Sequence, residues 1–510
     1  MNKTNSDWGG LREGAGRKSL LNKKQPTQVY LEPRLKKQIE MTEIDQCFNL
    51  SQKCAYLIKK GLQSMSDNVI TKTNNTLEIN NNFKVEKKTV KYIDLFAGLG
   101  GIRIGFENVL KRMGLEGKSV FVSEIKKSAV ESYSKNFPGS HISGDITKID
   151  AKSIPDFEFL LAGFPCQAFS SAGNRLGFKD TRGTLFFDIA RIIKEKQPTG
   201  FLLENVKGLV SHDNGKTLTV IINTLEELGY KVTYKVLNGK DFGLAQFRNR
   251  VYITGTRKKV VNLEGLPVKH KTLDSIIEKN VPPEDSDFAN KLLKHFSLEE
   301  VIGKQIKDKR GGHNNIHSWE FELKGDVSKE QNELMGLLLK QRRNKKWAPL
   351  IGIEWMDGMP LTIEMIKTFY NHDNLQEMLS NLVTKGYLAY EYPKKKEGNR
   401  RVYDKNLKKG YNIVTGKLSF KYSKILDPND VTPTLVATDI SKLAVPVQDG
   451  IRSLTIREGL RLFGFPEEYQ LSHIQTTKAY DLLGNTVCIP VIETISERLL
   501  EASNLQSDFS

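Results

Sequence analysis

The sequence predicts an α/β protein built on a mostly parallel sheet with helices on both faces. The first observation behind this prediction is a series of short apolar runs, expected as strands, at residues 91–97, 120–123, 157–162, 200–203, 231–237 and 250–255. The second is that amphipathic helical patterns lie between the runs, for example at residues 185–195 and 218–228. Strands that alternate with helices in this way are typical of parallel sheets.

Composition narrows the class of protein. The formal net charge of +17 favours a polyanionic partner, of which nucleic acid is the usual one. The four cysteines are scattered and show no CxxC spacing, so neither a disulfide framework nor a metal site is expected. The first residues are polar and no run of 18 apolar residues occurs, so we expect a cytoplasmic protein without a membrane partner.

A glycine-rich segment, DLFAGLGG at residues 94–101, ends the first expected strand. Glycines there let the chain turn sharply and let the backbone approach a ligand closely, although many such loops are only turns. Glu124 ends the second strand, where a carboxylate can bind ribose hydroxyls. Asp145 follows the next strand position and is a candidate acceptor for an adenine amino group. A solvated loop acid is the alternative for both.

The segment GFPCQAFS at residues 163–170 comes directly after an apolar strand. Ligands bind at the carboxyl ends of strands in open α/β sheets. Cys166 follows Pro165, whose stiff turn favours an exposed thiol over a packed one. Cys166 is therefore a candidate nucleophile, and an inert core cysteine is the alternative.

Two further segments supply an acid and two cations. Glu204 ends the apolar strand of LLENV, where burial raises a carboxyl pKa and suits a group that holds or donates a proton. Arg248 and Arg250 in QFRNR project to the same side of an extended segment and form a fork for a phosphate or a base carbonyl.

These residue types suit methylation of cytosine at carbon 5. That carbon becomes nucleophilic only after a thiolate adds at carbon 6, while an acid at N3 absorbs the developing charge and an arginine holds O2. The activated carbon then attacks a sulfonium methyl group. None of these atoms is reachable in a stacked duplex, so the base must be flipped out.

The segments DLFAGLGG, GFPCQAFS, LLENV, QFRNR, LTIREGLRLFGFP and LLGNTV occur in this order. The set resembles the motifs of the C5-cytosine-specific DNA methyltransferases, in particular those of bacterial restriction–modification systems. The resemblance covers residues 92–256 and 451–497. It implies a Rossmann-like S-adenosylmethionine-dependent methyltransferase domain with a smaller target recognition domain. The implied substrate is double-stranded DNA, which the enzyme would protect from a cognate restriction endonuclease without a physical complex.

The resemblance also implies residue roles. Cys166 would be the nucleophile, Glu204 the partner of N3, and Arg250 the contact to O2 with Arg248 assisting. Residues that would line the S-adenosylmethionine site are Phe96, Gly98, Gly100, Glu124, Asp145, Ile146, Gly163, Pro165, Leu185 and Asn485. Asn485 would fold back from the C-terminal region to complete the pocket.

The same comparison divides the chain. Residues 91–257 would form the first part of the catalytic domain, and residues 451–510 would complete it, starting with a helix that a Thr455–Glu458 capping box opens. Residues 258–450 occupy the place of the target recognition domain. A winged-helix insert at 328–405 is one interpretation, with helices at 361–369 and 374–383 and strands at 385–390 and 399–403 around a basic turn at 394–396. A lysine-rich irregular insert is the other. The run QRRNKK at 341–346 is a candidate phosphate contact.

Residues 1–66 contain a basic arm and a strand–helix–helix pattern that resembles a ribbon-helix-helix module, followed by a linker at 67–90. Such a strand pairs with that of a second chain, so an N-terminal homodimer and repression of the enzyme's own operon are hypotheses. A simple helical hairpin is the alternative.

Three other functions compete with DNA methylation. The family's RNA-methylating branch shares the chemistry, although it is compact where this chain is long. A catalytically inactive regulator would lack Cys166 or Glu204, and both are present. A thiol hydrolase would need a histidine base, and neither His141 nor His212 lies in a recognisable pairing motif.

Overall fold

The computed structural model describes residues 88–165, 185–398, 400–415 and 420–505. The chain divides into two units, Met1–Val85 and Glu86–Ser510, and all of the described residues belong to the second unit. The predicted N-terminal module and most of the linker lie outside the described residues, and so does Cys166. Within the described residues, no helix is both long and apolar enough to cross a membrane.

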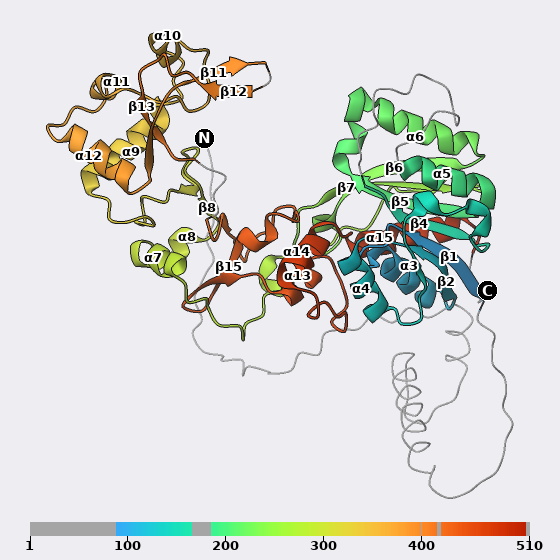
Figure 1. Cartoon of the computed structure of the whole chain (residues 1–510). Helices are drawn as coiled ribbons and strands as arrows, with labels where there is room; N and C mark the ends of the chain where they lie inside the picture. The colour runs from blue at the N-terminus through green and yellow to red at the C-terminus, as the bar shows by residue number, and fades with distance from the viewer. Residues whose placement is uncertain (1–87, 166–184, 399, 416–419, 506–510) are drawn as a thin grey trace, which may run out of the picture. The chain divides into compact units, whose positions relative to one another are not determined.

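A seven-stranded sheet in the order β3-β2-β1-β4-β5-β7-β6 forms the centre of this unit (Figure 1). Its strands are β1 (Thr89–Leu95), β2 (Glu116–Ser123), β3 (Ile142–Ser143), β4 (Phe159–Gly163), β5 (Gly200–Val206), β6 (Lys231–Asn238) and β7 (Asn249–Thr256). The first five strands are parallel, whereas β7 is antiparallel to both β5 and β6. The predicted α/β class is confirmed, and the reversed strand β7 is a feature that the apolar pattern did not predict.

Both faces of the sheet are covered, which explains why its strands are nearly continuous apolar runs. Along β4, Phe159 and Leu161 belong to one core, and Leu160 and Ala162 belong to the other. The first core includes α3 (Gly101–Arg112), and the second includes α5 (Leu185–Lys196) and α6 (Lys216–Glu227). Helix α4 (Lys127–Asn136) follows β2.

The C-terminal segment returns to this sheet. It contains α13 (Ile456–Arg461), α14 (Thr476–Gly484) and α15 (Ile489–Ala502), and α15 packs against α3. The two helices approach closely at Gly105, where an added Cβ would lie 2.7 Å from Ile492. The predicted capping box is confirmed: Thr455 accepts from the Glu458 amide, and Glu458 accepts from the Thr455 amide.

Residues 258–450 are more regular than their lysine-rich sequence suggested. A five-stranded sheet has the order β16-β15-β14-β8-β9. Its strands are β8 (Gln305–Ile306), β9 (Asn315–Ile316), β14 (Lys424–Ile425), β15 (Leu443–Val447) and β16 (Gly450–Ser453). Residues of this sheet share a small hydrophobic core with residues of α7 (Asp287–His295) and α8 (Leu298–Val301).

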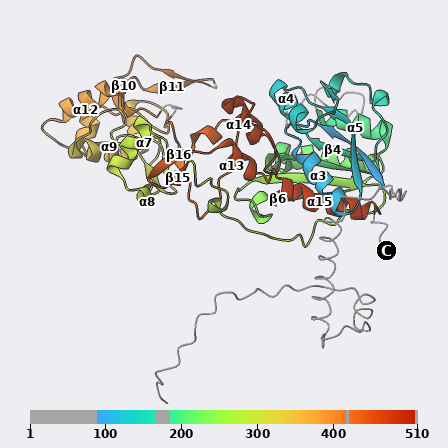
Figure 2. The same ribbon diagram turned by 90° about the horizontal axis from the view of Figure 1, so that it is seen from below.

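A second core within this region belongs to residues 319–413. Its helices are α9 (Lys329–Gln341), α10 (Trp347–Ile351), α11 (Ile363–Lys367) and α12 (Leu375–Thr384), and β10 (Leu388–Glu391) pairs with β13 (Gly410–Ile413). Figure 2 shows β11 (Lys394–Glu397) leading away from β10; β11 pairs with β12 (Arg400–Tyr403) in a hairpin. The lysines at 394–396, expected as a turn, therefore lie in a strand.

The expected phosphate-contact run at 341–346 is wrong for one of its arginines. Arg342 is 1% exposed, and its Nη1 donates to Asn412 Oδ1 at 2.7 Å and to the Ile413 carbonyl. This side chain joins the end of α9 to β13. A basic run in sequence does not distinguish a solvated cation from one that neighbouring carbonyls bury.

Candidate active site

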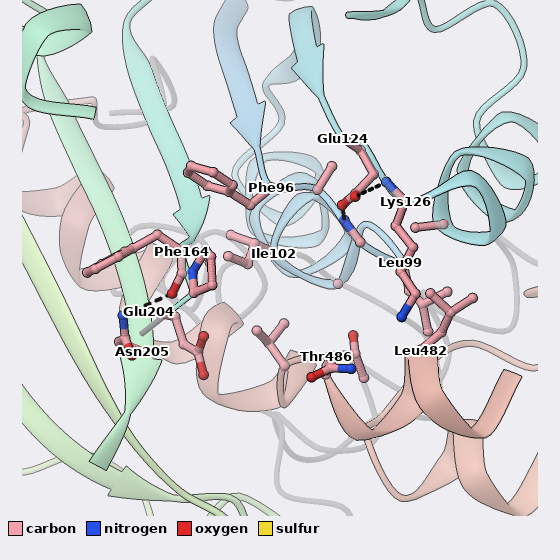
Figure 3. Close-up of a pocket in the computed structure, with 18 of the residues that line it drawn as sticks. Phe96, Leu99, Ile102, Glu124, Lys126, Phe164, Glu204, Asn205, Leu482 and Thr486 are labelled. Carbon is pink, nitrogen blue, oxygen red and sulfur yellow. Dashed lines mark hydrogen bonds between the residues drawn. The ribbon is translucent and has the colours of Figure 1, made fainter. Parts of the chain in front are cut away.

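A pocket of about 560 Å³ lies at the carboxyl ends of β1, β2, β4 and β5 (Figure 3). The sheet order reverses between β1 and β4, and ligands of open α/β proteins bind at such a switch point. The tertiary structure brings most of the predicted site residues to this one cavity, which is lined among others by Phe96, Gly98, Glu124, Asp145, Ile146, Gly163, Pro165, Leu185, Glu204, Arg248, Arg250 and Asn485.

Gly100 is the one described member of the predicted set that does not line this pocket. It precedes α3 in a left-handed conformation, with φ of 73°. An added Cβ there would lie 2.4 Å from the Phe137 ring. Gly100 is therefore required by the turn into α3 and by the packing of Phe137, rather than by contact with the cavity.

The glycine-rich loop is joined to the end of β2 by Glu124 (Figure 3). Its Oε2 accepts from the Gly98 amide at 2.8 Å, and its Oε1 accepts from the amides of Ile125 and Lys126 at 2.8 Å. An ionised carboxylate offers about four acceptor positions, so roughly one remains on Oε2 for a ligand hydroxyl. Gly98 has a φ of 54°, which a residue with a side chain rarely adopts.

Glu204 is the buried acid of the pocket. Burial raises the pKa of this carboxyl above its ordinary value, and the nearby Arg250 opposes that shift. Arg250 Nε lies 3.1 Å from Glu204 Oε1, and both side chains are nearly buried. The two residues are diagonal neighbours on the adjacent strands β5 and β7, because Glu204 is opposite Tyr252 and Arg250 is opposite Val206.

Gly163 lies beside this carboxyl. An added Cβ at Gly163 would lie 3.6 Å from Glu204 Oε2. The chain continues from Gly163 through Phe164, whose carbonyl accepts from Asn205 Nδ2 at 2.9 Å, to Pro165 at the pocket wall. Cys166 is the next residue in the sequence and lies outside the described residues.

Arg248 has surroundings that differ from those of Arg250. It is 2% exposed, and its guanidinium donates to three backbone carbonyls, those of Leu435, Gly484 and Thr486, at 2.7 to 3.1 Å. Burial lowers its pKa to about 10. The two arginines therefore do not form the single fork that the sequence predicted. Arg250 faces the Glu204 carboxyl, whereas Arg248 joins two segments that lie about 190 and 240 residues further along the chain.

Two predicted cofactor residues make local hydrogen bonds. Asp145 Oδ1 caps a short 3-10 helix by accepting from the Thr147 amide and hydroxyl, and these bonds lower its pKa. Asn485 ends α14, and its Nδ2 donates to the carbonyl and the carboxylate of Asp481. Both side chains line the pocket in these positions.

The sequence analysis missed several lining residues, of which Ile125 and Lys126 are the clearest. Ile125 is 71% exposed although it is a large apolar side chain at the pocket wall. Lys126 is paired with Asp481 of α14, so β2 and the C-terminal segment are connected beside the cavity. The sequence signal that could have identified both residues is their position directly after Glu124.

The strand order, with a glycine-rich loop and an acid at the ends of β1 and β2, defines the class of S-adenosylmethionine-dependent methyltransferases. The family model for C-5 cytosine-specific DNA methylases matches residues 90–501. The chain therefore belongs to the family of C-5 cytosine-specific DNA methylases, and it is a DNA cytosine-5 methyltransferase with S-adenosylmethionine as its cofactor.

Curated relatives cover the same part of the chain. It is 56% identical over 418 residues to the type II methyltransferase M.NlaIV of Neisseria lactamica, which covers 81% of this chain and 99% of the relative. It is 55% identical to M.NgoBV of Neisseria gonorrhoeae over the same shares. Identity to M.BanI of Aneurinibacillus aneurinilyticus is 42% over 437 residues, with 81% of this chain and 96% of the relative covered. These relatives are restriction–modification methyltransferases, which is consistent with methylation within a specific DNA sequence.

Proposed function

We propose that Cys166, Glu204 and Arg250 carry out the methylation of a cytosine flipped from a specific double-stranded sequence. The observation that carries this assignment is the position of Glu204 in the cofactor pocket beside Gly163, which precedes Cys166 by three residues. The raised pKa of Glu204 favours its protonated form, which is the form that can donate to N3. Arg250 holds one Glu204 oxygen through Nε, its Nη1 donates to the Asn249 carbonyl, and an N–H group that neither uses would donate to O2 of the base.

The pocket fits S-adenosylmethionine in the donor groups that it presents. The free acceptor position of Glu124 suits a ribose hydroxyl, and the exposed Ile125 suits the flat face of an adenine ring. Phe96, Gly98, Asp145, Ile146, Gly163, Pro165, Leu185 and Asn485 would form the rest of that site. When bound, the cofactor supplies an electrophilic methyl group.

Arg248 receives a different role from the one that its sequence suggested. Its Nη1 and Nη2 donate to three backbone carbonyls, so we assign it as a positioning residue that holds residues 484–486 against the pocket. The thiolate of Cys166 would add to carbon 6 of the base while Glu204 protonates N3. Carbon 5 would then take the methyl group that the bound cofactor supplies, and loss of the carbon 5 proton with return of the N3 proton to Glu204 would expel the thiolate.

A second pocket, of about 900 Å³, supports the proposal that residues 258–450 bind the DNA. It is lined in part by Lys240, Lys271 and Lys424 and by Phe247, which is 42% exposed. The Thr432 segment forms one wall and pairs with Gln246, two residues before Arg248. Residues 258–450 would thus act as the target recognition domain, between the catalytic segments 91–257 and 451–510.

Bisulfite sequencing of plasmid DNA from cells that express the enzyme or Cys166→Ala tests this function. Protected cytosines at one short motif, absent with the variant, are expected and would identify the target sequence. A folded wild type that binds S-adenosylmethionine and protects no cytosine would contradict the assignment and favour an RNA substrate.

Two finer assignments concern partners. The similarity to type II methyltransferases supports the proposal of a cognate restriction endonuclease as a functional partner in the same cell, with a cytoplasmic location for the enzyme. The N-terminal homodimer remains a prediction about residues outside the described part of the chain. Light scattering of the full chain and of residues 67–510 would test it: equal protomer numbers would contradict it.

A further inference from the structure

The hairpin β11–β12 carries an uncompensated cationic face. In its register, Lys394 is opposite Tyr403, and Lys396 is directly opposite Arg401. Because side chains alternate along a strand, these four residues share one face of the hairpin, here called the cationic face. Like charges directly opposite one another destabilise a strand pair. None of its three cations forms a salt bridge within the described residues; the Lys394 ammonium lies over the Tyr403 ring, Arg401 donates to the Trp355 carbonyl, and the Tyr403 hydroxyl donates to Glu391.

The other face of the same hairpin is compensated. Lys395 lies 3.5 Å from Glu397 and 3.8 Å from Asp404, and Arg400 is opposite Glu397. The wider segment is also basic: residues 391–409 contain eight lysines and arginines and three acids, a surplus of five. The charge is therefore arranged by face, which a merely soluble surface does not require.

Exposed aromatic rings lie beside the cationic face. Tyr403 is 49% exposed, with Lys394 Nζ 4.7 Å from its ring centroid. Arg401 Nη2 donates to the carbonyl of Trp355 at 3.3 Å, and Trp355 is 41% exposed with Lys345 Nζ 5.9 Å from its ring. Flat rings beside lysines and arginines suit a surface that binds a polyanion carrying sugars and bases.

The order of elements in the surrounding subdomain supports the winged-helix interpretation, which stays a prediction. Its elements follow the order α9, α10, an extended residue at Leu361, α11, α12, β10, the hairpin, and β13. Leu361 pairs with Tyr411 of β13, and β13 pairs with β10, so β13 is the middle strand. The exposed side of α12 presents Gln376, Glu377, Ser380, Asn381 and Thr384, without a cation. Cations are thus present on the hairpin and absent from the exposed side of α12.

We infer that the cationic face of the β11–β12 hairpin binds the phosphate backbone of double-stranded DNA outside the methylated sequence. This inference rests on the proposed function, in which residues 258–450 bind double-stranded DNA. Double-stranded DNA is the occupant because it is the polyanion on which the enzyme acts. Two lysines and an arginine on a narrow two-stranded ribbon suit phosphates, and contacts of that kind add affinity without sequence preference.

The experiment compares two double variants of the full-length enzyme. Lys396→Gln with Arg401→Gln removes two charges from the cationic face, and Lys395→Gln with Arg400→Gln removes two charges from the opposite face of the same strands. The probe is a fluorescein-labelled duplex that extends about two helical turns (~20 base pairs) on each side of a methylated site. Fluorescence anisotropy gives the dissociation constant at a series of KCl concentrations.

The cationic-face variant is expected to bind several-fold more weakly and to lower the slope of log affinity against log salt by about 1.8, or 0.9 per phosphate. The opposite-face variant is expected to change that slope by less than half as much. Equal changes in the two variants, or no change in either, would overturn the inference. Stronger competition by single-stranded RNA of the same length than by duplex would also overturn it.

Methyl transfer to a short duplex that ends at the site separates this inference from the proposed function. The cationic-face variant should keep the wild-type kcat on the short duplex, because the hairpin contacts lie beyond its ends. Loss of kcat on the short duplex would place the hairpin within target recognition and overturn the inference. A wild-type enzyme that methylates no DNA would refute the proposed function instead, while the salt comparison could still be made on any duplex.

Discussion

At the scale of single residues, the site depends on a buried carboxyl beside a buried cation. Glu204 would be ionised at neutral pH in water, and its burial at the end of β5 shifts it toward the protonated form. Arg250 limits this shift and fixes one carboxyl oxygen. The same chain segment supplies Asn205, which holds the Phe164 carbonyl just before the expected nucleophile.

Glu204→Gln is expected to lower kcat by at least about 100-fold, because the amide cannot transfer a proton to N3. In the wild type, activity should fall as the pH rises through the raised pKa of Glu204, where the protonated form is lost. Steady-state kinetics across pH measure both effects. Binding of S-adenosylmethionine to the variant, followed by calorimetry, should stay unchanged, and a variant with near-normal kcat would refute the assignment of Glu204.

Asp94 at the end of β1 offers a stability test. Burial raises its pKa to about 7, and Tyr133 donates to it at 3.1 Å. The folded state therefore retains a proton that the unfolded chain loses near pH 4, so this stabilisation is complete below that pH and is lost as the pH rises through 7.

Asp94→Asn removes that titration. The free energy of unfolding of the variant, relative to the wild type, should increase by roughly 3 kcal/mol between pH 5 and pH 8. Urea denaturation at the two pH values measures it. Two stability curves that run parallel across this range would contradict the buried, protonated state of Asp94.

At the scale of elements, the catalytic domain is assembled from two distant parts of the sequence. Helix α15 packs on α3, and Lys126 after β2 pairs with Asp481 of α14. Gly484 approaches the backbone so closely that an added Cβ would lie 2.2 Å from the Ala437 nitrogen. Arg248 is the central tie in this assembly, because its guanidinium reaches both the Leu435 and the Gly484–Thr486 segments.

Arg248→Met is expected to lower the free energy of unfolding by about 3–5 kcal/mol, because three buried carbonyls lose their donor. It should also raise the KM for S-adenosylmethionine by displacing Asn485 and Thr486. Thermal unfolding and cofactor titration measure these effects.

Arg250→Met is the matched control for Arg248→Met. It removes the same charge two residues further along the chain, and it should lower kcat strongly with a smaller loss of melting temperature. If Arg250→Met lowered the melting temperature more than Arg248→Met and lowered kcat less, the roles assigned to the two arginines would be wrong.

At the scale of the whole molecule, ligand binding should couple the segments that line the cofactor pocket. Leu99, Glu124, Gly163 and Asn485 come from four distant parts of the chain, and all of them line it. A ligand that contacts all four parts would stabilise the folded state over the unfolded chain.

S-adenosylmethionine at about 100 times its dissociation constant should stabilise the enzyme by about 2.7 kcal/mol. Differential scanning fluorimetry measures this as a rise in melting temperature. Glu124→Ala should lose most of the rise, because it removes the only carboxylate that accepts from the Gly98 loop among the described residues. A rise equal to that of the wild type would place the cofactor elsewhere.

The sequence by itself determined the class of fold, the motif order and the residue types of the site. Central strands buried on both faces, such as β4 and β5, are mainly apolar, and glycine favours the positive φ found at Gly98 and Gly100, so these features are local in the sequence. The capping box at Thr455 is equally local, since both partners lie within four residues.

Only the tertiary structure decided how the two arginines are used and where the positive charge of the insert is uncompensated. Arg248 and Arg250 are equivalent in sequence, and they differ because carbonyls about 190 and 240 residues further along the chain surround only one of them. The lysines at 394–396 form two different faces only because β11 is a strand in a fixed register with β12. Burial and cross-strand pairing are long-range properties, and a local pattern of residue types does not contain them.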